Sequence, residues 1–297
     1  MKILVTGGIG FLGRHIIMEL LKKNIETVSY DIGENRFPTS PYLKHIVGDI
    51  LDKEKLIAAM NGCDIVFHTA AVADVNVVRD IPEQTMEINV LGTTKCLQAA
   101  KECGVKRFLF ASSVYASGNH GSFYSISKRA GESLCKVYYE EFGVEYTILR
   151  YGSLYGNDAN HWNFIYNVCK ELLLTSKFTY TSSPDSMREY INILDAVRES
   201  VEIACDPAFV NKTVMITGHQ KMRVKELFAM IEEILGKSIE ITYTPKGKGH
   251  YVMTPYSFEW DTPIRVNFSQ YVDISEGILG CLNKAKKDIE YERNREN

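Results

Sequence analysis

The first fourteen residues, MKILVTGGIGFLGR, constrain the fold of this chain most strongly. Residues 3–6 form an apolar, β-branched run that is typical of a buried strand. Glycines follow at once, and residues 11–21 carry apolar side chains at helical spacing. A helix that begins directly after such a turn offers unpaired N–H groups and a partial positive charge, and glycine lets a ligand approach the backbone closely. The spacing of Gly7, Gly10 and Gly13 therefore favours a loop that binds the pyrophosphate of a dinucleotide over a simple tight turn.

An acidic residue, Asp31, follows the second expected strand at residues 26–30. In dinucleotide-binding folds a carboxylate roughly 20 residues after the glycines accepts hydrogen bonds from the adenosine ribose. The same charge repels the 2′-phosphate of NADP. The position therefore predicts NAD as the cofactor. Alternatively, Asp31 has only a structural role in a turn. The nearby Arg36 keeps NADP open as a second possibility for the cofactor.

Strands and helices alternate through the first half of the chain with short connections. We expect further strands at residues 45–47, 64–68, 108–111 and 145–149, and helices at residues 53–60, 82–103 and 124–142. This alternation predicts an α/β fold, a Rossmann-type doubly wound parallel sheet with helices on both faces. Ala70 and Ala71 follow the fourth strand, where small side chains let a cofactor lie against the backbone. His68 ends that strand, and a lone histidine there is expected to be structural.

From Tyr151 onward this rhythm loosens. One more strand is expected at residues 214–217 and a helix at 224–235, whereas residues 243–263 carry aromatics and prolines without periodicity. We predict an NAD-binding Rossmann domain at residues 1–156, to which segments near 188–217 return. Residues 157–297 are expected to form a smaller C-terminal lobe that mainly binds substrate.

Composition argues against several classes of protein. The formal net charge of −3 disfavours a surface that binds nucleic acid or an anionic membrane. The seven cysteines contain no C-x-x-C pair and are expected to be reduced thiols, and the sequence predicts no metal site. Because the N-terminus is already a strand and no apolar run approaches the ~20 residues of a membrane span, we expect a cytoplasmic protein.

A tyrosine and a lysine four residues apart begin the helix expected at 124–142, so Tyr124 and Lys128 share one face of it. A free tyrosine titrates near about 10, and a neighbouring ammonium group stabilises the phenolate that a base requires. Ser113, at the end of the preceding strand, is placed to hydrogen-bond the same substrate oxygen. A Tyr–Lys pair alone is commonly a surface feature. Its combination with a strand-end serine and a dinucleotide loop predicts proton and hydride transfer.

These motifs together resemble the extended short-chain dehydrogenase/reductases, in particular the NAD-dependent nucleotide-sugar epimerases and dehydratases. The resemblance covers nearly the whole chain. It rests on the segments TGGIGFLG (6–13), GDI (48–50), HTAA (68–71), INVLGT (88–93), ASS (111–113), YSISK (124–128), LRYGSLYG (149–156) and REYINILD (188–195).

The resemblance implies a set of site residues. The implied catalytic residues are Ser113, Tyr124 and Lys128. The implied cofactor contacts are Gly7, Gly10, Phe11, Leu12, Gly13, Asp31, Asp49, Ile50, Ala70, Ala71, Asn89, Tyr124, Lys128 and Tyr151. The implied substrate contacts are Ser112, Ser153 and Arg188. Among these, Arg188 corresponds to the arginine that holds the diphosphate of the sugar nucleotide, for which bidentate pairing is the physical reason.

Three departures from the family's pattern bear on the reaction and the substrate. The loop that follows Ser113 is short. Ser153 stands where the family has an asparagine, and Asn192 stands where it has a histidine. Related dehydratases carry an acidic pair after the catalytic serine, whereas this chain has Val114 and Tyr115, neither of which can act as that acid.

We therefore expect an NAD-dependent nucleotide-sugar epimerase that oxidises a sugar hydroxyl transiently to a ketone. An NAD(P)H-dependent 4-ketoreductase of a nucleotide deoxysugar stays open as an alternative. A catalytically silent dinucleotide sensor is a further alternative, against which the intact catalytic set argues. The resemblance also implies a homodimer built on two long helices, which carry the apolar residues Leu91, Leu97, Leu134 and Val137.

Overall fold

The computed structural model describes residues 1–75, 77–118, 122–159, 163–244, 264–265, 270 and 272–296. These residues divide into two compact units. The first comprises Met1–Tyr151, Val197–Ile216 and Phe258–Val266, and the second comprises Gly152–Ala196, Thr217–Ser257 and Asn267–Asn297. The second unit thus begins slightly before the boundary predicted after residue 156. The predicted aperiodic stretch 243–263 lies almost entirely outside the described residues.

An eight-stranded parallel sheet forms the centre of the first unit, with the order β13-β10-β6-β5-β4-β1-β2-β3. Its strands are β1 (Lys2–Thr6), β2 (Glu26–Asp31), β3 (Leu43–Val47), β4 (Ile65–His68), β5 (Arg107–Ser113), β6 (Glu145–Tyr151), β10 (Lys212–Ile216) and β13 (Ile264–Arg265). The chain winds outward from β1 in one direction and then from β4 in the other. In open α/β sheets, ligands bind beyond the carboxyl ends of the strands at such a switch point. The predicted Rossmann-type fold is confirmed.

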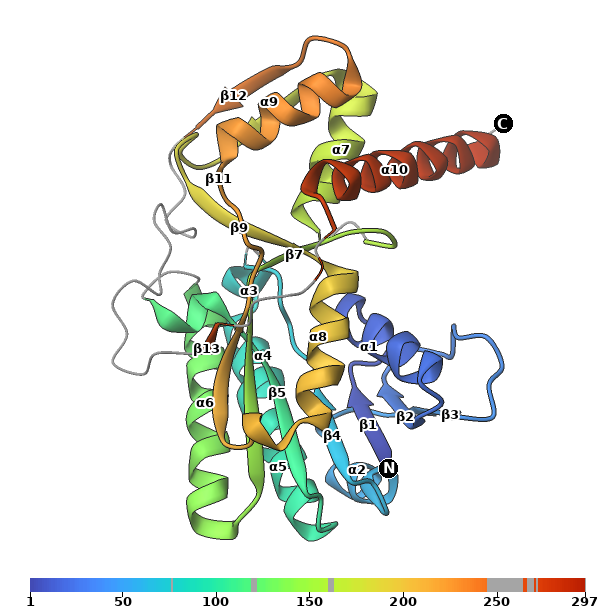
Figure 1. Ribbon diagram of the computed structural model, residues 1–297, viewed down its shortest axis with the longest axis vertical. Helices are drawn as coiled ribbons and strands as arrows, with labels where there is room; N and C mark the ends of the chain where they lie inside the picture. Colours follow the sequence, from blue (N-terminus) through green and yellow to red (C-terminus); the bar gives the residue numbers. More distant parts are fainter. Residues whose placement is uncertain are drawn as a thin grey trace. The chain divides into compact units, whose positions relative to one another are not determined.

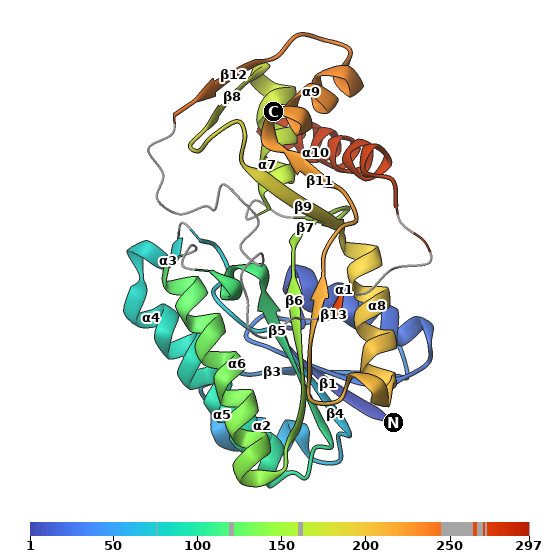
Figure 2. The same cartoon turned by 60° about the vertical axis from the view of Figure 1, so that its left-hand side comes forward.

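Helices cover both faces of this sheet. They are α1 (Phe11–Lys22), α2 (Lys53–Met60), α3 (Val77–Asp80), α4 (Pro82–Met86), the π-helix η1 (Glu87–Gly92), α5 (Thr93–Glu102), the 3-10 helices η2 (Val114–Ser117) and η3 (Pro207–Phe209), α6 (Ser122–Phe142) and α8 (Ile193–Cys205), which enters the first unit at Val197. Figures 1 and 2 show α2, α5 and α6 side by side on one face, with α1 and α8 on the other. The single long helix predicted at 82–103 is interrupted by η1, and π-helical segments inside α-helices are frequent at functional sites.

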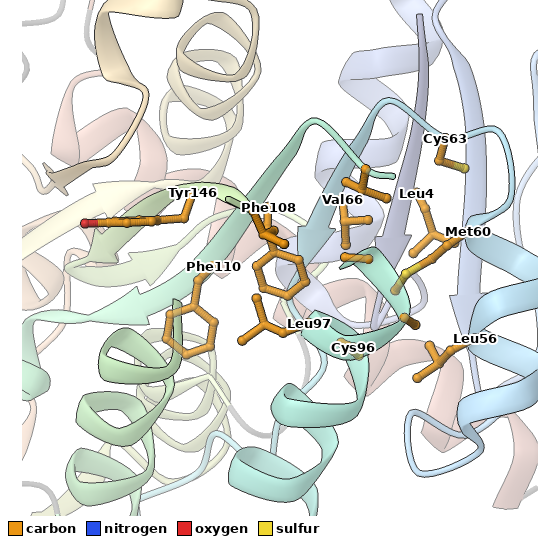
Figure 3. Close-up of a cluster of buried hydrophobic side chains, with 14 of the residues drawn as sticks. Leu4, Leu56, Met60, Cys63, Val66, Cys96, Leu97, Phe108, Phe110 and Tyr146 are labelled. Carbon is orange, nitrogen blue, oxygen red and sulfur yellow. The ribbon is translucent and has the colours of Figure 1, made fainter. Parts of the chain in front are cut away.

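The hydrophobic core between the sheet and α2, α5 and α6 is continuous. Figure 3 shows Leu97 of α5 beside Phe108 and Phe110 of β5, and all three side chains are fully buried. Burying one such side chain contributes about 2 kcal/mol. Leu97 therefore belongs to the core and not to the surface on which a dimer interface could form. Leu91 and Val137 are about half exposed, at 46% and 48%.

The second unit contains two small sheets, with the orders β11-β9-β7 and β12-β8. Its elements are β7 (Ser153–Tyr155), α7 (Phe164–Thr175), β8 (Lys177–Tyr180), β9 (Met187–Asn192), β11 (Lys221–Arg223), α9 (Val224–Leu235), β12 (Glu240–Tyr243) and α10 (Ile274–Glu296). A cluster of aromatic rings packs α7 and α9 against the two-stranded sheet. It consists of Phe164, Phe178, Tyr180, Phe228 and Tyr243. Across the described part of the chain, the helices are all too short or too polar to traverse a lipid bilayer.

Candidate active site

The loop after β1 is shaped by glycines that leave no room for side chains. Gly7 has a φ of +67°, and a Cβ atom there would lie 2.7 Å from the Cα of Ala70, because the pairing of Thr6 with His68 brings the ends of β1 and β4 together. A Cβ atom on Gly13 would overlap the carbonyl oxygen of Gly7. The glycine loop and the first turn of α1 therefore pack with their backbones in direct contact. Such a loop lets a phosphate approach the backbone closely.

The N-terminus of α1 is open to an anion. Its cap residue, Gly10, has no side chain to satisfy the N–H groups of the first turn, and that turn, which contains Phe11 and Leu12, carries no acidic residue. Free N–H groups and the helix dipole at such a position favour a phosphate. The geometry of this loop and helix therefore fits the pyrophosphate of NAD.

Asp31 is held beside the glycine loop by two backbone hydrogen bonds. The Ile9 N–H donates to its Oδ2 at 3.0 Å, and the Gly33 N–H donates to its Oδ1 at 2.9 Å. Each carboxylate oxygen keeps a second lone pair that is able to accept a hydrogen bond from a ribose hydroxyl. Arg36 is exposed and lies in the loop beyond. This arrangement favours Asp31, rather than Arg36, as the residue that meets the ribose.

The segment after β3 lies next to the end of β2. The Gly48 N–H donates to the carbonyl oxygen of Asp31 at 2.7 Å, which brings the exposed Asp49 to the edge of the sheet. The Asp49 carboxylate accepts the Leu51 N–H at 2.9 Å. Ile50 differs from its neighbour, because its side chain is buried in the core cluster. Asp49 thus lies at the carboxyl edge of the sheet, whereas the side chain of Ile50 packs inward.

His68 is enclosed in a hydrogen-bonded chain that the sequence analysis did not foresee. Its Nε2 lies 2.9 Å from the Thr93 hydroxyl, which itself donates to the carbonyl oxygen of Asn89, so Nε2 is the donor. Its Nδ1 lies 2.8 Å from the Thr6 hydroxyl and accepts from it. Burial lowers the pKa of His68 to about 3, with a smaller contribution from Lys128. The ring is therefore neutral and structural, as expected.

Asn89 fastens the loop after β4 to α6. Its side-chain amide accepts from the Val72 N–H at 2.7 Å and donates to the Val72 carbonyl at 2.9 Å and to the Ser127 hydroxyl at 3.0 Å. Val72 directly follows Ala70 and Ala71, which are half-buried. Asn89 lies within the π-helix η1 and is itself buried. It thus positions the alanine segment predicted to lie beside the cofactor, with its own polar atoms engaged in these bonds.

Ser113, Tyr124 and Lys128 come together in the first unit. Ser113 ends β5, and its side chain accepts the Tyr115 N–H at 3.3 Å and hydrogen-bonds with Tyr124. Lys128 is buried one helical turn after Tyr124, with its Nζ 5.6 Å from the centre of the tyrosine ring. The Lys128 ammonium donates to the Ala111 carbonyl at 2.7 Å, which fixes it beneath the half-buried tyrosine.

The electrostatics of this cluster are set by burial. Burial raises the pKa of Tyr124 to about 12, although the hydrogen bond with Ser113 opposes the rise. Burial lowers the pKa of Lys128 to about 8, and the Glu132 carboxylate opposes that shift. The phenol is therefore protonated at neutral pH in the absence of a further positive charge. Oxidised nicotinamide carries such a charge, so the cluster fits a cofactor of this kind.

Two predicted ligand contacts are directed into the protein interior. The Ser112 hydroxyl donates to Glu132 Oε1 at 2.5 Å, which favours a supporting role for it over the predicted substrate contact. The Tyr151 hydroxyl hydrogen-bonds with the Ser200 hydroxyl at 2.7 Å, so the side chain of Tyr151 packs inward as well. Glu132 also forms a buried ion pair with Arg150. The spacing of four residues between Lys128 and Glu132 is the sequence signal that could have revealed this group.

Ser153 and Arg188 both belong to the second unit, on the neighbouring strands β7 and β9. Arg188 is 5% exposed and donates to the Met187 carbonyl at 2.7 Å and to the Tyr180 hydroxyl at 3.3 Å. Asn192, the departure at the family's histidine, accepts the Leu194 N–H at 3.0 Å at the start of α8. The guanidinium of Arg188 is therefore oriented by contacts with both small sheets of the second unit, while Ser153 is half-buried on the edge strand β7.

A comparison with known proteins shows the family to which this chain belongs. The profile of the NAD dependent epimerase/dehydratase family matches residues 3–214, which is more than two thirds of the chain. The chain belongs to this family. It is therefore an NAD-dependent enzyme of the extended short-chain dehydrogenase type, and the glycine loop, Asp31 and the Tyr124 cluster are the parts of it that fit this cofactor.

Individual relatives show how broad the epimerase/dehydratase family is. The uncharacterized UDP-glucose epimerase YtcB of Bacillus subtilis is 29% identical, over 84% of this chain and 87% of its own length. The UDP-N-acetyl-alpha-D-glucosaminuronate decarboxylase of Bacillus cytotoxicus is 27% identical, over 87% and 86%. The structure of the UDP-glucose 4-epimerase of Thermotoga maritima with UDP-glucose has a TM-score of 0.83 at 23% identity, over 97% of this chain and 100% of that one. At similar identity, relatives thus carry out different reactions.

Proposed function

We propose that this chain is a nucleotide-sugar epimerase that works by transient oxidation of a ring hydroxyl to a ketone. The observation that carries the proposal is the grouping of Ser113, Tyr124 and Lys128, in which a hydroxyl, a phenol and a buried ammonium share one short stretch of the fold. A dinucleotide sensor has no need of such a proton-transfer set. The relatives named above that act on UDP-sugars point to the same substrate class.

The residues of this chain would act on one substrate hydroxyl. The glycine loop and Asp31 would hold NAD, which would supply reversible hydride transfer at the carbon that bears the hydroxyl. The Tyr124 phenolate, which the Lys128 ammonium stabilises, would accept the proton of the hydroxyl as the ketone forms and become a neutral phenol. The Ser113 hydroxyl donates to the same substrate oxygen and orients it. When the opposite face of the ketone is presented, Tyr124 gives the proton back, so the configuration is inverted without net oxidation.

Dehydration is disfavoured by the residues that follow Ser113. Elimination of water requires acid–base groups at the neighbouring carbons in addition to the tyrosine. Val114 is buried and apolar, and Tyr115 packs edge-on against Tyr124 with its ring centre 6.3 Å away. Neither provides a carboxylate. A 4-ketoreductase, the second candidate, uses the same three residues and differs in consuming reduced cofactor stoichiometrically.

The second unit is proposed to bind the nucleotide diphosphate, with Arg188 as the anchor. A guanidinium pairs with phosphate oxygens in a bidentate manner, and its contacts with Met187 and Tyr180 already hold it in one orientation. Ser153, on the adjacent strand, is the proposed polar contact to the sugar. A small hydroxyl at this position leaves more room than the asparagine typical of the family.

A homodimer is proposed as the working form, and the cytoplasm as its location. Support for the dimer comes from exposed apolar side chains on the helices that carry Asn89 and the Tyr–Lys pair, namely Leu91, Ile126 and Val137. Exposed apolar residues at the spacing of one helix face are typical of helix pairing. Sedimentation at micromolar protein concentration that finds only monomer would overturn this part of the proposal.

A panel of nucleotide sugars tests the proposed function. UDP-glucose, UDP-galactose, UDP-glucuronate and UDP-N-acetylglucosamine are compared by thermal shift in the presence of NAD, and the stabilising compounds are incubated with enzyme. The expected product has the mass of its substrate and an inverted ring centre by NMR. A product lighter by water or by carbon dioxide would instead identify a dehydratase or a decarboxylase.

A further inference from the structure

Three functional groups line one face of α6 at successive turns. Tyr124, Lys128 and Glu132 are each separated by four residues, which places them above one another on a helix. Lys128 and Glu132 are both 5% exposed. On the buried face of α6, the carboxylate of Glu132 is therefore the next charged group after the Lys128 ammonium.

Glu132 is fixed by two neighbouring strands. Arg150 of β6 donates through Nε to Glu132 Oε1 at 2.8 Å and through Nη2 to Oε2 at 2.6 Å, in a bidentate pair. Ser112 of β5 donates to Oε1 at 2.5 Å. Ser112 and Arg150 are direct partners in the β5–β6 register, and Ser112 immediately precedes Ser113. The ion pair thus joins the helix that bears Tyr124 to the strand that bears Ser113.

The other groups that face Lys128 carry no charge at neutral pH. On α6 these are Tyr124 and Cys135, and burial raises the pKa of both above the ordinary values. On β4 it is His68, which is neutral because its pKa is lowered to about 3. Among the described residues, the charged groups on this side of Lys128 are Glu132, whose attraction opposes the effect of burial, and Arg150, which is paired with Glu132.

We propose that Glu132, balanced by Arg150, is a positioning residue that keeps the Lys128 ammonium group charged beside Tyr124. Burial alone favours a neutral lysine, which cannot stabilise a phenolate. The carboxylate counteracts this, while the bidentate contact with Arg150 holds the Glu132 side chain in position. The inference rests on the proposed function only in assigning Lys128 a role in proton transfer.

The test measures the titration of Lys128 directly, without substrate or cofactor. Protein labelled with ¹³C at the ε-carbons of lysine is titrated by NMR, and the Lys128 signal is assigned by its loss in Lys128→Met. Glu132→Gln removes the carboxylate and leaves the Arg150 charge, so the pKa of Lys128 should fall by about one unit or more. The double variant Glu132→Gln/Arg150→Met removes both charges, and only part of this fall should be recovered, because the carboxylate that attracts the ammonium is still missing.

Two further variants separate charge from packing. Glu132→Asp shortens the side chain but keeps its charge, and the pKa of Lys128 should stay close to that of the natural protein. Glu140→Gln, at an exposed position on the same helix, is the matched control and should change nothing. Replacing both members of a buried ion pair is commonly tolerated, so the double variant keeps the test available if Glu132→Gln does not fold. In that case the double variant and Glu132→Asp are compared with the natural protein.

Activity provides the second readout once a substrate is known. The basic limb of the pH–kcat profile should move to lower pH in Glu132→Gln and return only in part in the double variant. A purely structural role predicts lower kcat with an unmoved profile, and a double variant no better than the single one. An unchanged Lys128 titration in Glu132→Gln would overturn the inference, whatever the enzyme's substrate proves to be. If Glu132→Gln fails to fold, an unchanged titration in the double variant would overturn it, as would a shifted titration in Glu132→Asp.

Discussion

Acidification should destabilise this protein through His68. The neutral ring donates to Thr93 and accepts from Thr6, and protonation would place a second N–H against a hydroxyl that now donates to it. The pKa in the folded protein is about 3, below the unfolded value of about 6.5. Between these values the unfolded chain binds more protons than the folded one. The stability associated with the neutral ring is therefore complete above pH 6.5 and is lost as the pH falls toward 3.

The magnitude follows from these two pKa values. Linkage gives a loss of about 2 kcal/mol from His68 alone between pH 7 and pH 5. Urea denaturation followed by circular dichroism at pH 7, 6 and 5 measures the total loss. The same series on His68→Gln, which cannot titrate, provides the reference, because the other titratable groups are common to both proteins.

The variant is expected to be less stable at pH 7, since two buried hydrogen bonds are altered, but its stability should fall by about 2 kcal/mol less on acidification. The two stability–pH curves should therefore converge toward pH 5. Parallel curves would refute the reasoning, because they would mean that His68 gains no proton on unfolding in this range. His68→Asn, which is shorter, should give the same slope if charge rather than packing is responsible.

Further predictions concern the site itself. Tyr124→Phe should lower kcat by about 10²–10⁴-fold and leave NAD affinity nearly unchanged, whereas Lys128→Ala should lower both kcat and NAD affinity. A Tyr124→Phe enzyme with more than about a tenth of the normal rate would indicate another base. His120, which lies outside the described residues, would be the first to examine. Equilibrium titration should find NAD bound at least about tenfold more tightly than NADP, because the half-buried carboxylate of Asp31 would repel the 2′-phosphate. Equal affinities would point to Arg36 instead. Gly13→Ala should weaken NAD binding by about 5- to 150-fold, since its Cβ atom would overlap the Gly7 carbonyl and overpacking of this kind costs about 1–3 kcal/mol. An unchanged affinity in a calorimetric titration would contradict the close packing.

Much of the first unit could be predicted from the sequence, because its signals are local. A β-branched run followed by glycines and a helical apolar pattern has few structural solutions, and β1, the turn and α1 form where predicted. Asp31 was located by its distance from the glycines alone. The alternation of strands and helices was sufficient for the parallel sheet, because the central strands β1, β4 and β5 are buried on both faces and are rich in apolar residues.

Features that depend on long-range contacts were not predictable in the same way. The π-helix at Asn89 has no local signature, and its side chain is recruited by a backbone loop seventeen residues away. The inward orientation of Ser112 depends on its hydrogen bond to Glu132, a residue of α6 twenty positions along the chain. The small strands of the second unit are three to six residues long and pair across large sequence separations, so periodicity carries little information there.

The central claim, that a sugar hydroxyl is oxidised and then restored, is tested most directly by following the NADH absorbance band during complete conversion of a nucleotide sugar. The enzyme is supplied with one equivalent of NAD per chain and a large excess of substrate. The account predicts many turnovers with no net change in absorbance and with a product of unchanged mass. Conversion that stops after one turnover, or that proceeds only with steady consumption of NADH, would contradict it and assign the chain to the ketoreductases.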